Sequence, residues 1–97
     1  MTRWASRTDK THKELVDALR DLGWTIKNTH QLGDFVDAVG IHKDHPGATL
    51  FEFKTAKGKL TDSQQNLRDR GWPITILRSV DDAVVFTRHG GRTWEPR

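Results

Sequence analysis

The chain has 97 residues, of which 34% are hydrophobic and 30% are charged, and its mean hydropathy is −0.73. This length supports a single domain with a modest core, which leaves little room to bury a large organic cofactor. The lack of cysteine excludes disulfides, thiolate zinc sites and cysteine nucleophiles, and it agrees with a reducing compartment. Because no apolar run approaches the ~18 residues of a membrane span, we expect a cytoplasmic protein with no membrane partner.

The net charge of +3 comes entirely from the second half of the chain. Before Thr49 there are seven Lys and Arg against seven Asp and Glu, and from Thr49 onward there are nine against six. An excess of this kind is compatible with a polyanionic partner such as a nucleic acid, although it does not prove one.

The first half of the chain predicts a helix followed by strands. Residues 1–10 are polar and basic, and they predict an N-terminal arm. Apolar residues recur at helical spacing from Thr11 to Leu22, where Thr11 and Glu14 fit a capping box and a glycine follows the last turn. Residues 24–30 are rich in β-formers and predict a strand.

Two further strands follow, separated by segments that are typical of turns. The predicted elements are a turn over 31–34, a strand over 35–41, a turn over 42–48 and a strand over 49–55. Side chains alternate along the last of these strands, so Phe51 and Phe53 face the first helix while Glu52 and Lys54 face the other way. If the two strands pair as a hairpin, Asp37 lies beside Glu52.

The rest of the chain contains a second helix and a buried strand. Thr61 and Gln64 form another capping box, which opens a helix that ends at Gly71, and residues 73–77 predict a strand. Residues 81–86 fit either a short helix followed by a strand or a strand alone, and residues 89–97 predict a tail or a hairpin arm. The order α-β-β-β-α-β describes a mixed sheet flanked by helices, that is, one α/β (α+β) domain over residues 11–88.

Asp37, Glu52 and Lys54 are the residues whose chemistry needs an explanation. Two carboxylates that converge beside an ammonium group favour a hard cation such as Mg²⁺, which binds carboxylates, retained waters and phosphate oxygens. A nearby lysine can orient or deprotonate the attacking water. The chemistry implied is metal-assisted attack on a phosphodiester.

These residues resemble the core of the PD-(D/E)XK nucleases, which carry an Asp and an E-x-K element on adjacent strands after a helix. The segments FVD (35–37), FEFK (51–54), KLTDSQ (59–64), GWPITIL (71–77) and SVDDA (79–83), in this order, are similar to the VRR-NUC branch, particularly its small stand-alone phage members. One departure is Val36, since the family usually has proline before the aspartate. The likeness covers roughly residues 11–86.

The resemblance implies a restriction-endonuclease-like fold and a function. The chain would be a Mg²⁺- or Mn²⁺-dependent endonuclease that cuts branched DNA, such as four-way (Holliday) junctions or flaps, leaving 5′-phosphate and 3′-hydroxyl ends. It would act as a homodimer, because two symmetric cuts across a junction need two sites.

The resemblance also assigns roles to single residues. Asp37 and Glu52 would bind the metal together with the Phe53 carbonyl, and Glu14 would support a second ion. Lys54 would be the catalytic lysine, with Gln64 near the reacting groups. The residues expected to bind the nucleic acid are Lys57, Lys59, Arg68, Arg3 and Arg7.

Other readings stay open at this point. Glu52 and Lys54 also fit a surface ion pair, while Glu14 and Gln64 are explained by their capping boxes. A non-catalytic nucleic-acid-binding module on the same fold, or a module that binds another protein, is therefore an alternative. The motif from His42 to His45 has a metal-like spacing without a third ligand, and Asn28-Thr29-His30 lacks the second histidine that an HNH nuclease needs.

Overall fold

The computed structural model describes residues 3–33, 35–90 and 94–96, with only the backbone described for residues 3–9. Its elements are α1 (Arg3–Asp21), β1 (Thr25–Asn28), the 3-10 helix η1 (His30–Leu32), β2 (Ala38–His42), β3 (His45–Phe53), α2 (Asp62–Asp69), β4 (Ile74–Leu77) and α3 (Val80–His89). The strands form one sheet in the order β1-β2-β3-β4, in which β1, β2 and β3 are antiparallel and β4 runs parallel to β3. The predicted mixed α/β (α+β) class is confirmed.

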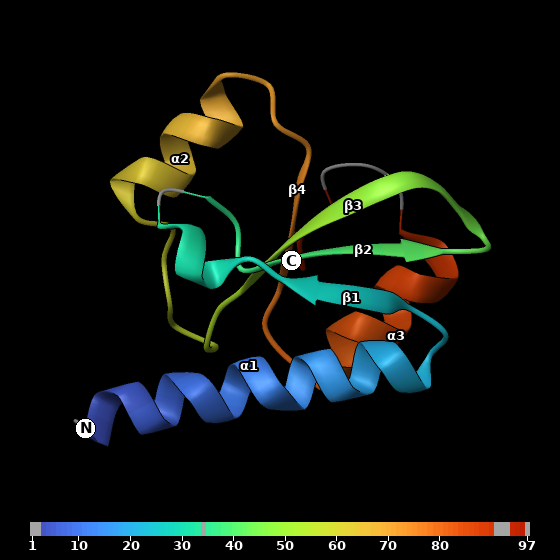
Figure 1. The fold of residues 1–97 in the computed structure, drawn as a ribbon, viewed down its shortest axis with the longest axis horizontal. Helices are drawn as coiled ribbons and strands as arrows, with labels where there is room; N and C mark the ends of the chain where they lie inside the picture. The colour runs from blue at the N-terminus through green and yellow to red at the C-terminus, as the bar shows by residue number, and fades with distance from the viewer. Residues whose placement is uncertain (1–2, 34, 91–93, 97) are drawn as a thin grey trace.

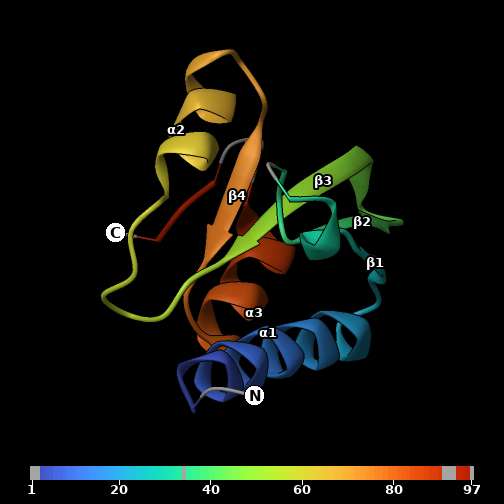
Figure 2. The same cartoon turned by 60° about the vertical axis from the view of Figure 1, so that its left-hand side comes forward.

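The sheet separates two apolar clusters, with α1 and α3 on one face and α2 on the other (Figures 1 and 2). Phe51 and Phe53 lie in the larger cluster with the buried leucines of α1 and with Phe86 of α3, as the alternation along β3 predicts. Leu50, on the opposite face of β3, lies in the smaller cluster, against which Leu60 and Leu67 pack. Both faces of β3 are therefore buried over its last four residues, from Leu50 to Phe53.

Close packing across β1 and β2 depends on Gly40. Its register partner in β1 is Ile26, and a Cβ atom at position 40 would lie 2.6 Å from the Cδ1 of Ile26 and 3.1 Å from Phe51 Cε2. A larger residue would push these two core side chains apart, so glycine allows the strand to pass beneath them.

Several predicted boundaries differ from the structure, among them the strand predicted over 35–41, which begins at Ala38 so that Asp37 precedes it. The helix begins at Arg3 and not at Thr11, because residues 3–10 contain no helix breaker and continue the helical backbone, so the predicted arm over 1–10 is in part helical. The turn after β2 is short, since His42 and His45 are already register partners and β3 starts at His45. Residues 80–89 form one helix whose N-cap is Ser79, which accepts a hydrogen bond from Asp82 N at 3.1 Å.

The strand directions bring several connections to one end of the sheet. β1, β3 and β4 finish there and β2 begins there, because Asn28 pairs with Ala38, Ala38 pairs with Phe51, and β4 is parallel to β3. We call this the site end of the sheet. It gathers η1, Asp37 and the segment after β3, and the middle of α1 passes beneath it (Figure 1). Within the described part of the chain, no helix combines the length and apolar character that crossing a membrane requires.

Candidate functional site

Asp37 is held at the site end of the sheet by contacts to β3. Its backbone N–H donates to the Phe51 carbonyl at 3.1 Å, and its Oδ2 accepts a hydrogen bond from Phe53 N at 2.8 Å. Because Ala38 pairs with Phe51, Asp37 lies opposite Glu52, as expected from a hairpin. The structure thus brings the two predicted carboxylates together.

Glu52 is a buried carboxyl that no N–H group of the described residues reaches. The residue has 0% exposure, and within the described part of the chain its oxygens have no hydrogen-bond donor as a partner. Burial, followed by a hydrogen bond to the Asp37 side chain and by the charge of that side chain, raises the pKa of Glu52 from its ordinary 4.5 to about 9, and Lys54 opposes this effect. At neutral pH and without a cation, Glu52 is therefore protonated beside Asp37.

Lys54 follows directly and is half-buried. Its backbone N–H donates to the Leu77 carbonyl at 3.0 Å, which continues the pairing between β3 and β4 past the end of both strands. Its ammonium is the cation that lowers the pKa of Glu52, so the predicted group of two carboxylates and one lysine is assembled.

A basic loop leaves the site end of the sheet after Lys54. Lys57 and Lys59 are exposed on it. Arg78, which follows β4, holds this loop by donating from Nη1 to the carbonyls of Thr55 at 2.8 Å and Gly58 at 2.6 Å. One arginine thus fixes the loop that carries two lysines, a role that sequence reasoning missed because the contact joins two distant segments.

The residues of α2 have structural partners. Gln64 forms the predicted capping box, in which its Oε1 accepts from Thr61 N at 2.9 Å and its own N–H donates to Thr61 Oγ1 at 3.3 Å. Arg68 forms an ion pair with Glu95. Arg68 is therefore already neutralised in part, which weakens the case for it as a phosphate contact.

The predicted metal ligand Glu14 does not join the acidic pair. Its exposed carboxylate lies 3.9 Å from the Lys10 ammonium on α1. Within the described residues, no three or more His, Asp or Glu side chains form a group that could hold a metal ion. Arg3 and Arg7 are on the first turns of α1, where the side chains lie outside the described residues.

A second set of polar residues beside Asp37 was not predicted as a site. A cavity of about 490 Å³ opens between α1 and the end of β1, lined in part by His12, Asn28, His30 and Asp37. The His12 Nε2 lies 2.8 Å from Asn28 Oδ1. The motif Asn28-Thr29-His30 was the available signal, but the pairing of Asn28 with His12 requires the fold.

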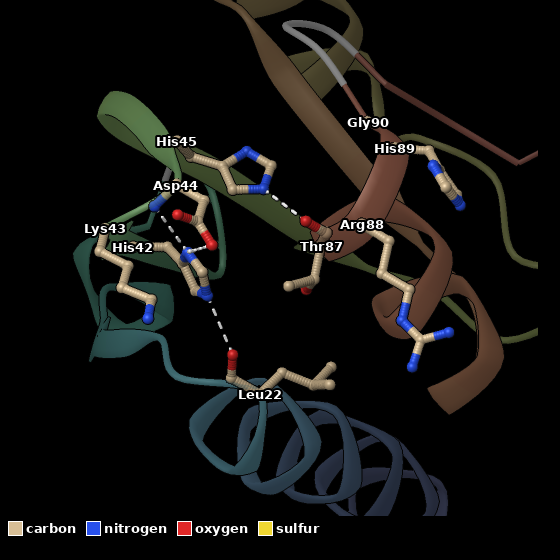
Figure 3. Close-up of a pocket in the computed structure, with 9 residues that line it drawn as sticks. All are labelled: Leu22, His42, Lys43, Asp44, His45, Thr87, Arg88, His89 and Gly90. Carbon is tan, nitrogen blue, oxygen red and sulfur yellow. Dashed lines mark hydrogen bonds and ion pairs between the residues drawn. The ribbon is translucent and has the colours of Figure 1, made fainter.

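The hairpin histidines connect the sheet to the helices (Figure 3). His42 Nε2 donates to the Leu22 carbonyl just after α1 at 2.9 Å, and His45 Nε2 donates to the Thr87 carbonyl in the last turn of α3 at 2.9 Å. The His42 Nδ1 accepts from Asp44 N at 3.0 Å, so both ring nitrogens of His42 are engaged within the chain. These histidines line a cavity of about 750 Å³, and their hydrogen bonds there hold the sheet to the two helices.

Comparison with known proteins gives one set of relatives. The chain is 31% identical over 83 residues to the large ribosomal subunit protein uL14 of Mesomycoplasma hyopneumoniae, in strains 7448, J and 232. The match covers 86% of this chain and 66% of the relatives, so the chain spans just under two thirds of their length. No family model matches the chain. No solved structure matches it either.

This similarity contradicts the predicted activity. The matched proteins are proteins of the large ribosomal subunit, whereas the sequence had predicted a metal-dependent endonuclease acting on branched DNA. The predicted roles in junction resolution, recombination and repair are wrong on the same ground. The carboxylate pair, whose assembly the structure does show, therefore needs an explanation other than phosphodiester cleavage.

Proposed function

We propose that this chain is a non-catalytic RNA-binding protein with a structural role in a ribonucleoprotein particle. The observation that carries the proposal is the 31% identity with a protein of the large ribosomal subunit over 86% of the chain. A ribosomal subunit consists largely of RNA, so a protein bound within it needs a surface that binds RNA phosphate groups.

The basic loop supports this proposal. Exposed Lys57 and Lys59 project from a segment that Arg78 holds at two carbonyls, so their positions are restrained before RNA arrives. Restrained cations lose less freedom on binding than cations on a loose end. The positive excess of the second half of the chain adds a general attraction for phosphate.

We also propose that Mg²⁺ binds at Asp37 and Glu52, in a structural role. The buried Glu52 oxygens, which no donor among the described residues reaches, fit a hard cation, which would take the place of the proton that Glu52 otherwise shares with Asp37. Two protein carboxylates leave room for waters or phosphate oxygens on the ion. Bound there, Mg²⁺ would let RNA phosphates approach a region that the two acids would otherwise repel.

The resemblance to the PD-(D/E)XK core then concerns architecture only. The order helix, three strands, helix, strand and the position of Asp37 opposite Glu52 support a shared scaffold. The predicted homodimer stays a prediction.

RNA binding is tested by a fluorescence titration of the chain against large-subunit ribosomal RNA fragments over a series of salt concentrations. We expect affinity to fall linearly with salt on logarithmic axes, with Lys57→Ala and Lys59→Ala each reducing the slope by about 0.7. Lys43→Ala is the matched control, because Lys43 is also exposed but lies in the hairpin turn at the far end of the sheet. Binding that is absent, or equally weakened by all three variants, would contradict the proposal.

Mg²⁺ binding is tested by thermal unfolding with Mg²⁺ or with a chelator. We expect Mg²⁺ to raise the Tm of the wild type and to leave Asp37→Asn and Glu52→Gln unchanged, because a ligand that binds only the folded state stabilises it. Glu14→Gln should respond as the wild type does. An equal rise in all four proteins would show that the ion binds elsewhere.

A further inference from the structure

We propose that the cavity beside Asp37 holds a single unstacked nucleobase of the bound RNA, recognised by Asn28 and stacked on His30. This inference rests on the proposed RNA binding, and it assigns a ligand to residues that have no role in that proposal. It follows from four features of the cavity.

The first feature is size and position. The cavity has a volume of about 490 Å³, within the range of about 300–1,000 Å³ that is typical of small-molecule sites. Asp37 lies in its wall, so it opens directly beside the acidic pair at the site end of the sheet. The basic loop leaves the same end of the sheet, after β3.

The second feature is charge, which favours a neutral ligand. Lys13 is paired with Asp17 at 2.7 Å, and the Arg20 guanidinium donates to the Ile26 carbonyl at 3.1 Å. Of the formal charges in the cavity wall, Lys13 and Arg20 are balanced by Asp17 and Asp37. A free anion gains little in such a site, whereas an uncharged planar ring needs no net charge there and requires only hydrogen bonds for its polar edges.

The third feature is an aromatic column formed by Phe53, His12 and His30. The ring of His12 lies edge-on to buried Phe53 and edge-on to exposed His30, with both centroid separations at 4.9 Å. The column therefore runs from the core to the surface and ends in an exposed ring. Single-stranded RNA is recognised mainly through unstacked bases that pack on rings of this kind.

The fourth feature is the orientation of the Asn28 amide. Its Oδ1 accepts from His12 Nε2 at 2.8 Å, which leaves the Nδ2 donor and the second lone pair of Oδ1 for a ligand. The Nδ2 donor pairs with an acceptor on a base edge, such as uracil O4 or guanine O6. The paired contact to adenine also requires the Asn oxygen, which it would share with His12, so this contact is weaker than one to a free amide.

Free nucleosides test the cavity apart from the rest of the RNA. Uridine, guanosine and adenosine are titrated into the ¹⁵N-labelled chain, and amide shifts are followed by NMR. We expect uridine or guanosine to shift the amides around Asn28 and His30, with adenosine binding more weakly. Absence of a shift at these amides with any of the three nucleosides, or tightest binding of adenosine, would overturn the proposal.

Two variants separate the polar and the stacking contacts. Asn28→Asp keeps the oxygen that His12 needs but removes the donor, and His30→Ala removes the exposed ring. We expect each to weaken nucleoside binding by about tenfold, the size of a lost base stack. The same changes at exposed sites elsewhere, Asn66→Asp and His89→Ala, should bind as the wild type does. Equal loss in the variants and their controls, or no loss in either, would overturn the proposal.

A parallel RNA titration distinguishes a failure of this site from a failure of RNA binding. An RNA that binds the wild type, Asn28→Asp and His30→Ala with one affinity would overturn the base pocket while RNA binding stands. Nucleoside binding that Asn28→Asp weakens, in a chain that binds no RNA, would contradict the proposed function and reassign the cavity to a free nucleoside or nucleotide.

Discussion

At the scale of single residues, the acidic pair is the feature that the sequence predicted best. Strand alternation and a hairpin between residues 35–41 and 49–55 were enough to place Asp37 beside Glu52, and the register of β2 and β3 confirms it. The complete burial of Glu52 could not be predicted. Glu52 shares its face of β3 with Leu50, and the cluster on that face is completed by residues from distant segments, such as Ile74, Ile76 and Leu67.

The raised pKa of Glu52 makes stability depend on pH. The folded chain keeps a proton that the unfolded chain releases above about pH 4.5, so this contribution to stability is complete below that pH and is lost as the pH rises toward about 9. In the presence of a chelator, we expect the free energy of unfolding of the wild type to fall relative to Glu52→Gln between pH 5 and 9, since the Gln side chain does not titrate.

Urea unfolding at a series of pH values measures this difference. Glu14→Gln is the control, because Glu14 is an exposed carboxylate on α1 and its loss should leave the pH profile of the wild type unchanged. Parallel profiles for the wild type and Glu52→Gln would show that Glu52 is ionised in the folded chain.

At the scale of elements, capping boxes predicted the first residue of a helix only where the preceding residues were not themselves helical. The Thr61 and Gln64 capping box begins α2 as expected, and the predicted strand over 73–77 is the fully buried β4. The same kind of pattern at Thr11 failed because helix-compatible residues precede it and α1 continues through it. Helix α3 was left undecided since Ala83 and Phe86, its only described buried residues, give a weak periodicity.

The α2 cap has a measurable effect on stability. Thr61→Ala removes the hydroxyl that accepts from Gln64 N, and we expect it to lower the free energy of unfolding by about 1 kcal/mol. Thr61→Ser keeps a hydroxyl at the same place and should restore most of the loss. Chemical denaturation measures both, and an equal loss in the two variants would show that the methyl group, and not the cap, stabilises the helix.

At the scale of the whole molecule, the sequence predicted the fold class but not the function. The net positive charge and the acidic pair are both compatible with a protein that binds nucleic acid. The chemistry of the acidic pair and Lys54 further predicted that the protein cleaves it. The similarity to a large-subunit ribosomal protein contradicts the predicted nuclease activity. The same residue types hold Mg²⁺ beside a phosphate group whether the protein cleaves the phosphodiester or only binds it. The presence of Asp37, Glu52 and Lys54 in the sequence therefore could not distinguish a nuclease from a binding protein.

The central claim is that the chain binds RNA without cutting it. The most direct measurement incubates the chain with an end-labelled ribosomal RNA fragment in Mg²⁺ and reads bound fraction and RNA length from the same samples. We predict saturable, salt-sensitive binding to an RNA that stays intact. Cleavage that requires Mg²⁺ and disappears in Lys54→Ala, or the absence of any binding, would contradict the account.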